Sequence, residues 1–122
     1  MRILLIAFAV GQLLLGLLLW LAPGFFYDEI GPYPPRNDHY MADLATFYLA
    51  LGGATLVAVR RVNWRVPVLA LALVQYALHS LNHLIDIGES DPSWLGPADF
   101  ASLLFTALLL GWMLRHESEV AA

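Results

Sequence analysis

The sequence predicts an all-α integral membrane protein, a four-helix bundle with both termini in the cytoplasm. Of its 122 residues, 60% are hydrophobic and only 13% are charged, and the mean hydropathy is +0.68, which excludes an ordinary water-soluble domain. Four apolar runs approach the roughly 20 residues that a helix needs to cross a bilayer. These runs are about 3–22, 40–59, 66–86 and 97–115. The uneven distribution of arginine between the loops then sets the orientation.

The limits of each predicted span follow from local signals. The apolar run at 3–22 is too long for a secretory signal peptide, so we expect a retained helix. The long connection at 23–38 holds four prolines and several aromatic residues, which indicates a loop that folds back at the membrane surface. Asn37 or Asp38 is placed to cap the second helix, and Pro67 and Pro97 fall in first turns, where a missing N–H is harmless. The other connections are short, so residues 1–122 are expected to form one transmembrane domain.

The distribution of charged residues predicts the orientation of the chain in the membrane and argues against nucleic acid as a partner. Five of the six arginines lie at the N-terminus, between the second and third runs, or in the C-terminal tail, and the positive-inside rule places these segments in the cytoplasm. Eight of the ten acidic residues lie at the other end. We therefore expect a multi-pass protein of the inner, cytoplasmic membrane in contact with the lipid bilayer. The chain has no lysine and no basic patch, so nucleic acid is not expected as a partner.

Polar side chains gather on one face of two predicted helices. At about 100° per residue, one stripe of the third helix holds Gln75, Tyr76, His79, Asn82, His83 and Asp86. His39 and Asp43 share a face of the second helix with small residues. Ionisable groups in a span are expected to face the interior of the bundle and are candidates for function. Because the two helices run in opposite directions, we expect the two pairs to meet near the outer end.

The first hypothesis for these residues is a metal site. The chain has no cysteine, and imidazole and carboxylate groups suit Zn²⁺, Mn²⁺, Fe²⁺ or Cu²⁺. The predicted ligands are His39, Asp43, His79 and His83. The side chains expected to surround and orient them are Gln75, Tyr76, Asn82, Asp86 and Asp99. Haem is less favoured, because two histidines on adjacent turns cannot bind opposite faces of one macrocycle.

Two other functions fit the same residues. Asp43, His79 and His83 could act as catalytic acids and bases, without a cofactor, on a lipid-like substrate such as a quinone, an isoprenoid or a polyketide. Alternatively, the polar stripe only joins helices in a small accessory subunit of a membrane complex or in a homo-oligomer. The sequence leaves open whether the protein is an enzyme, and metal content would separate the first hypothesis from the others.

The chain also resembles a group of small four-span membrane proteins of actinobacterial type and, more broadly, the DoxX-like four-helix proteins. The resemblance is carried by Trp20 to Pro23, by the N-[DE]-H-x3-D segment from Asn37 to Asp43, and by the paired His79 and His83. It implies a membrane four-helix bundle with these His and Asp residues as its signature, and it implies no particular activity. Phe47 and Tyr48 stand where that group has a Gly and an Asn, so the chain departs from it at a polar position.

Overall fold

The computed structural model describes residues 1–121, with side chains through residue 119, and this part of the chain is helical without a β-strand. The elements are α1 (Arg2–Leu21), α2 (Pro23–Glu29), α3 (Asp38–Arg60), a short 3-10 helix η1 (Val62–Trp64), α4 (Arg65–Ile85) and α5 (Leu95–Ala121). The all-α prediction is confirmed. The helices form two compact units, residues 1–64 and a second unit that begins at Arg65.

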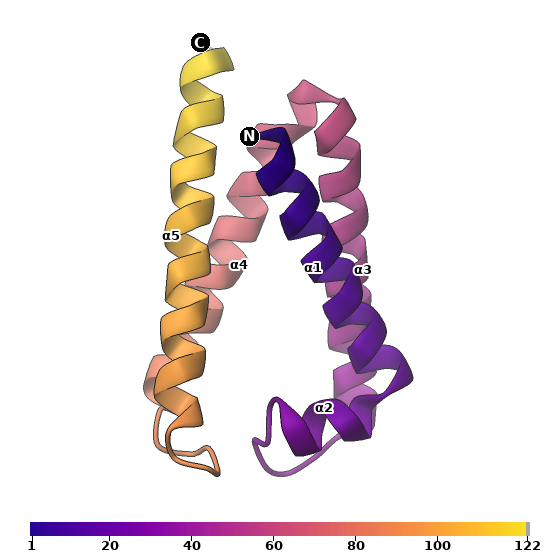
Figure 1. Cartoon of the computed structure of the whole chain (residues 1–122), viewed down its shortest axis with the longest axis vertical. Coiled ribbons are helices and arrows are strands. Elements are labelled where there is room, and N and C mark those ends of the chain that lie inside the picture. Colours follow the sequence, from indigo (N-terminus) through magenta and orange to yellow (C-terminus); the bar gives the residue numbers. More distant parts are fainter. Residues whose placement is uncertain (122) are drawn as a thin grey trace. The chain divides into compact units, whose positions relative to one another are not determined.

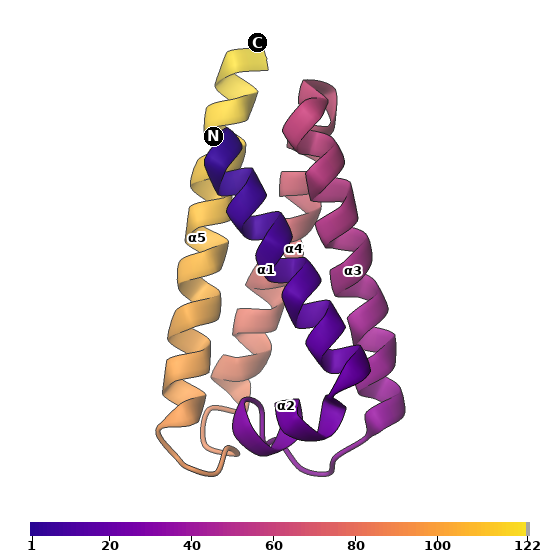
Figure 2. The same ribbon diagram turned by 45° about the vertical axis from the view of Figure 1, so that its right-hand side comes forward.

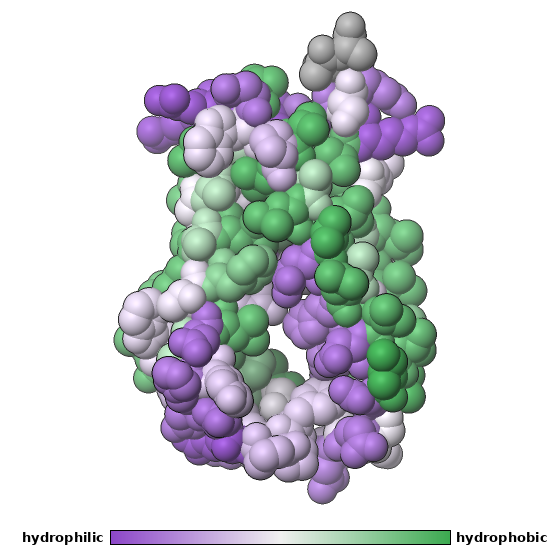
Figure 3. Space-filling model, turned by 180° about the vertical axis from the view of Figure 1, so that it is seen from behind, coloured by the Kyte–Doolittle hydropathy of each residue, from purple (hydrophilic) through white to green (hydrophobic). Residues whose placement is uncertain are grey.

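Four helical segments are long and apolar enough to cross a membrane, which confirms the predicted spans. They are Arg2–Leu21, Asp38–Arg60, Val62–Ile85 and Leu95–Glu119. On the face seen in Figure 3, hydrophobic residues cover much of the surface between the ends, hydrophilic residues gather at the ends, and some hydrophilic residues also lie between them. The third helix starts at Asp38 because Asn37 caps it, its Oδ1 accepting a hydrogen bond from the Tyr40 N–H at 3.1 Å. The last helix runs beyond residue 115, where the Arg115–Glu119 pair at 2.9 Å supports an additional turn.

The first unit is built on an antiparallel pair of helices, α1 and α3 (Figure 1). Buried residues recur every three or four positions on each helix, which places them on one face. On α1 they are Leu5, Ala9, Gln12, Gly16 and Leu19, and on α3 they include Ala45, Tyr48, Gly52, Thr55 and Val59. Many of these residues are small, and small residues let helix backbones approach closely within a membrane.

The short helix α2 was not predicted, and it runs across the ends of α1 and α3 (Figure 2). Ala22 ends α1 and also precedes α2, and Pro23 occupies the first position of the new helix, where proline is favoured. Phe26 holds α2 in place by packing against a buried cluster of Leu19, Ala45 and Tyr48. The connection therefore folds back on its own helix pair, as its composition suggested.

Arg36 fastens the end of this connection. Its guanidinium group lies beside Gly24, where a Cβ atom would stand 3.1 Å from Nη2. The same group pairs with Asp38, with Nε 2.6 Å from Oδ1. The hydrogen bond to the Asp38 carboxylate raises the pKa of Arg36 above its ordinary value. Arg36 thus bridges the start of α2 and the first residue of α3.

The second unit is the antiparallel pair α4 and α5 (Figure 1). Its apolar interior includes Val68, Leu69, Ala72, Ala107, Leu110 and Met113. At one end, the connection from residue 86 to 94 closes against α5, because the Gly96 N–H donates to the buried Ser90 Oγ at 2.8 Å. Pro67 and Pro97 each stand third in their helices, in the first turns as predicted.

Candidate functional site

Three polar side chains from α4 and α5 lie together near the end of the second unit where α4 stops. His79 and His83 stand one turn apart on α4, with ring centroids 4.9 Å apart and planes tilted by 55°. The Nδ1 atom of His83 lies 3.9 Å from the Asp99 Oδ2 atom of α5. This distance fits an ion pair but is too long for a direct hydrogen bond. His83 thus lies beside both His79 and Asp99.

Helical periodicity explains why these residues converge. The α4 face that packs on α5 includes the buried residues Ala72, Tyr76 and Ser80, and His83 lies on the same side, two turns after Tyr76. Asp99 follows the buried Gly96 by three residues and so points from α5 in the same direction as Gly96. The side chains of His83 and Asp99 are only 14% and 26% exposed.

The structure gives the other predicted residues of this stripe different surroundings. Tyr76 is buried, Gln75 is half-buried, and Asn82 is exposed. Asp86 is half-buried just beyond the last residue of α4, and none of the ion pairs among residues 1–119 includes it. Asp99, predicted to lie around the site, approaches the imidazole of His83.

The hydroxyl groups closest in sequence to the cluster are engaged by backbone carbonyl groups of their own helices. Ser80 Oγ donates to the Ala77 carbonyl at 2.9 Å. Ser102 Oγ donates to the Asp99 carbonyl, and Thr106 Oγ1 to the Ser102 carbonyl, each at 2.9 Å. The ionisable groups of this cluster are thus two imidazoles and one carboxylate.

The other predicted pair belongs to the first unit. His39 Nε2 lies 3.5 Å from Asp43 Oδ2 on adjacent turns of α3, and the two side chains are 79% and 65% exposed. Their face also carries the exposed residues Thr46 and Ala50, and it points away from the residues that pack on α1. We predicted from the sequence that this pair meets His79 and His83. These residues belong to different units, so their meeting stays a prediction.

The exposed faces of the other long helices are different in character. They carry large apolar side chains, including Leu14 and Leu21 on α1, Val74 and Leu78 on α4, and Phe105 and Leu108 on α5. Such stripes suit contact with lipid chains. The polar face of α3 does not, which makes His39 and Asp43 a second place where ionisable groups are held in a span.

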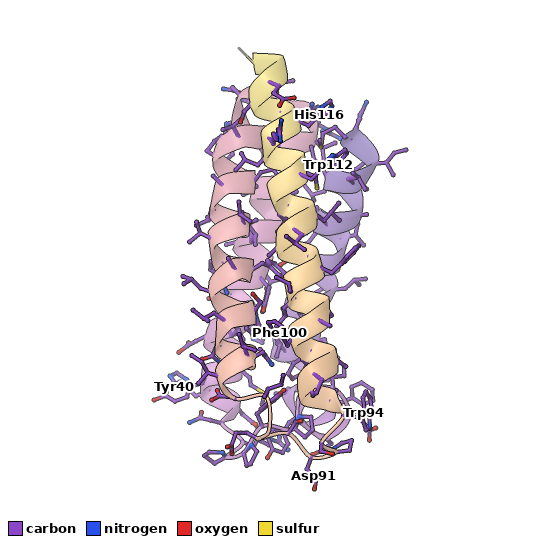
Figure 4. The ribbon with its side chains drawn as sticks, turned by 90° about the vertical axis from the view of Figure 1, so that its left-hand side faces the viewer. Tyr40, Asp91, Trp94, Phe100, Trp112 and His116 are labelled. Atoms are coloured by element: carbon purple, nitrogen blue, oxygen red, sulfur yellow. The ribbon has the colours of Figure 1, made fainter. Side chains whose placement is uncertain are left out.

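A second polar contact, missed by the sequence analysis, joins the opposite end of the second unit. Arg65 Nη1 donates to both carboxylate oxygens of Glu117 at 3.3 Å, and the side chains are 17% and 5% exposed. Nearby on α5, the rings of Trp112 and His116 stack with centroids 5.9 Å apart (Figure 4). Trp94 lies beside the other end of the same helix (Figure 4). Glu117 gave no signal in the sequence, because it stands in a tail rich in charged residues.

The cluster does not have the ligand spacing of a formed metal site. Among residues 1–119, no group of three or more His, Asp or Glu side chains is arranged to hold a metal ion. Two ligands of one tetrahedral zinc ion, with bonds of about 2.0–2.2 Å, stand about 3.4 Å apart. The 3.9 Å between His83 and Asp99 is longer than that, so a side chain has to turn before both can bind one ion.

Comparisons with protein family models, with curated proteins and with solved structures find no match. The functional assignment therefore rests on the residues of this chain.

Proposed function

We propose that the protein is a multi-pass membrane protein that binds one divalent metal ion through His79, His83 and Asp99. The observation that supports this is that His83 lies beside both other residues, with its ring 4.9 Å from that of His79 and its Nδ1 3.9 Å from Asp99 Oδ2. An ion bound to two imidazoles by bonds of about 2.0–2.1 Å holds the ring centroids about 4.5–5.2 Å apart. The spacing of the two histidines already fits this range.

Forming the site requires His83 and Asp99 to come to ligand spacing, about 0.5 Å closer than the 3.9 Å that now separates them. Nitrogen and oxygen donors suit Zn²⁺, Mn²⁺, Fe²⁺ or Cu²⁺. The carboxylate also offsets part of the charge of the ion within the membrane span.

The sequence also predicted His39 and Asp43 as ligands, and this stays a prediction separate from the proposed three-residue site. They form a pair with the same one-turn spacing, 3.5 Å apart, on a face unsuited to lipid. If replacing His39 or Asp43 abolishes metal binding, the replaced residue is a ligand. If binding is unchanged, all the ligands belong to the second unit.

The test is metal binding by the purified full-length chain. After removal of bound metal with a chelator, titration with Zn²⁺ should show one site per chain, lost in His79→Ala and in His83→Ala. Asp99→Asn should weaken binding by about tenfold or more. His116→Ala is the matched control, because His116 is exposed on α5 and stacks on Trp112.

Stability gives a second measurement. Metal at a hundred times its dissociation constant should stabilise the wild type by about 2.7 kcal/mol, because it binds the folded state. Protons compete for the imidazole nitrogens, so binding should weaken at acidic pH. A protein that takes up none of Zn²⁺, Mn²⁺, Fe²⁺ and Cu²⁺ would rule out the proposal.

In that case the His83–Asp99 pair favours acid–base chemistry. A carboxylate beside an imidazole can orient the ring and stabilise its protonated form, and a substrate that reaches a half-buried pair within a span would be lipid-like, such as a quinone or an isoprenoid. A purely structural role in an accessory subunit makes a different prediction. His79→Asn and His83→Asn would then be tolerated, because an amide still forms hydrogen bonds between helices.

The location is part of the same proposal. We place the protein in the cytoplasmic membrane with both termini inside, on the strength of the arginine distribution. Membership of the DoxX-like group is likewise proposed from the sequence resemblance alone.

A further inference from the structure

We infer that one end of the first unit binds the phosphate group of an anionic phospholipid through Arg2, Arg60 and Arg61. At this end, called the arginine end below, α1 begins and α3 finishes, because the two helices are antiparallel (Figure 1). These residues lie in a different unit from the proposed metal site, and their binding of lipid needs no metal.

The packing of α1 on α3 brings the three arginines to one level. Gly16 lies against Ala45, and Gly52 lies against Ala9. Because both helices rise by about 1.5 Å per residue, this register sets Arg2 level with the last turn of α3. No run of basic residues marks the arginine end in the sequence, because residues from two helices form it.

The charges of the arginine end have no opposing carboxylate in their own unit. The three arginine side chains are exposed, and none of the ion pairs among residues 1–119 includes them. The acidic residues of the first unit all lie between positions 28 and 43. Asp43, the nearest of them along α3, is about 25 Å of helix away from Arg60. That distance exceeds the screening length of about 10 Å at 0.1 M salt.

The chain holds the two adjacent arginines at the membrane surface. One candidate span ends at Arg60 and the next begins at Val62, so Arg61 stands between two spans, at the level of the lipid headgroups. The backbone is fixed there, because the Arg61 N–H donates to the Val57 carbonyl at 2.8 Å and the Trp64 N–H donates to the Arg61 carbonyl at 3.0 Å. Val62 and Trp64 are 57% and 42% exposed, and tryptophan favours the membrane interface.

An anionic phospholipid complements this arrangement. A guanidinium group can bind two phosphate oxygens by parallel hydrogen bonds, and its charge is permanent. The exposed apolar side chains of Val62 and Trp64 suit contact with the lipid below its headgroup. Each arginine near the surface is expected to favour anionic lipid by about fivefold. A zwitterionic lipid gains less, because its headgroup carries a cation of its own.

The experiment measures lipid retention by the full-length chain in an uncharged detergent. Phosphatidylglycerol and phosphatidylcholine with the same acyl chains are added in equal amounts, and native mass spectrometry counts the bound molecules of each. The wild type should prefer phosphatidylglycerol, and Arg60→Gln and Arg61→Gln should each lower this preference by about fivefold. The double variant Arg60→Lys with Arg61→Lys should keep most of the preference, because it keeps the charge. Circular dichroism confirms that each variant is folded.

Arg115→Gln is the matched control, because it also removes one exposed arginine, but one whose charge already faces Glu119 at 2.9 Å. Its lipid preference should equal that of the wild type. Equal retention of the two lipids by the wild type would overturn the inference. An effect of Arg115→Gln as large as that of Arg61→Gln would also overturn it, because any arginine would then serve.

Inorganic phosphate separates a lipid site from a site for free phosphate. Added at the same ionic strength as a chloride control, it should not displace phosphatidylglycerol, because the lipid also contacts apolar side chains. Displacement by phosphate alone would assign the arginine end to a soluble anion and overturn the lipid as its ligand.

Discussion

Gly16 of α1 lies directly against Leu49 of α3. A Cβ atom at Gly16 would stand 2.8 Å from Leu49 Cγ and 3.1 Å from the Ala45 carbonyl oxygen. Gly52 of α3 has the same relationship in reverse, 2.8 Å from Leu13 Cγ and 3.1 Å from the Ala9 carbonyl oxygen. Each helix thus supplies one leucine and one glycine, and the leucine of each covers the glycine of the other. This reciprocal packing holds the first unit together.

Gly16→Ala is therefore expected to destabilise the first unit by about 1–3 kcal/mol, the usual effect of forcing an extra carbon into a packed interface. Leu49 branches at the atom in contact, and the Ala45 oxygen belongs to the backbone, so neither moves freely. The free energy of unfolding in mixed detergent micelles measures the effect. Gly11→Ala is the control, because a Cβ there meets nothing within 4 Å and alanine favours the helix by up to about 1 kcal/mol. Equal stability of the two variants would contradict the close contact of Gly16 with Leu49.

The spans were predictable from the sequence because length and apolarity alone define them, and all four are present. The second span holds two adjacent glycines, and only Gly52 lies against α1, whereas a Cβ at Gly53 would meet nothing within 4 Å. Composition identified the type of residue at such an interface, whereas the rotation of the helix decides which glycine faces the partner.

The candidate site was predictable only in part. The one-turn spacing of His79 and His83 follows from helical geometry and needs no tertiary structure. Asp99 was predicted to lie around the site, and its approach to His83 depends on how α5 packs against α4. The short helix α2 escaped prediction because seven residues are too few for a periodic pattern.

Ser90→Ala is expected to destabilise the second unit by about 1–3 kcal/mol. The Gly96 N–H donates to Ser90 Oγ at 2.8 Å, and the change leaves this buried donor without its acceptor. Water has little room to replace the hydroxyl, because a Cβ at Gly96 would already overlap the Ile87 carbonyl oxygen. The thermal unfolding transitions of the wild type and of Ser90→Ala measure the difference in stability. Ser93→Ala, an exposed position in the same connection, should leave the transition unchanged.

Glu117→Gln is expected to cost about 1–3 kcal/mol, because it removes the carboxylate charge that faces the part-buried guanidinium of Arg65. The exposed Arg115–Glu119 pair on the same helix provides the comparison, with side chains 82% and 62% exposed. Glu119→Gln should cost no more than about 0.5 kcal/mol. Denaturation at high salt sharpens the contrast, since salt screens the exposed pair much more than the buried one. Similar costs for both substitutions would show that Glu117 is not buried in the membrane-bound protein.

Orientation can be tested with single cysteines, because the chain has none of its own. Cysteines at Glu29 and at Glu89 are expected to react with an impermeant thiol reagent in intact cells, whereas cysteines at Asn63 and Ser118 are not. All four positions are exposed, so access to the reagent rather than burial decides the result. Labelling after lysis should modify all four and serves as the control. If the cysteines at positions 63 and 118 reacted in intact cells, the orientation would be the reverse of the predicted one. The His83–Asp99 end would then lie on the cytoplasmic side. The metal would then have to come from the cytoplasm.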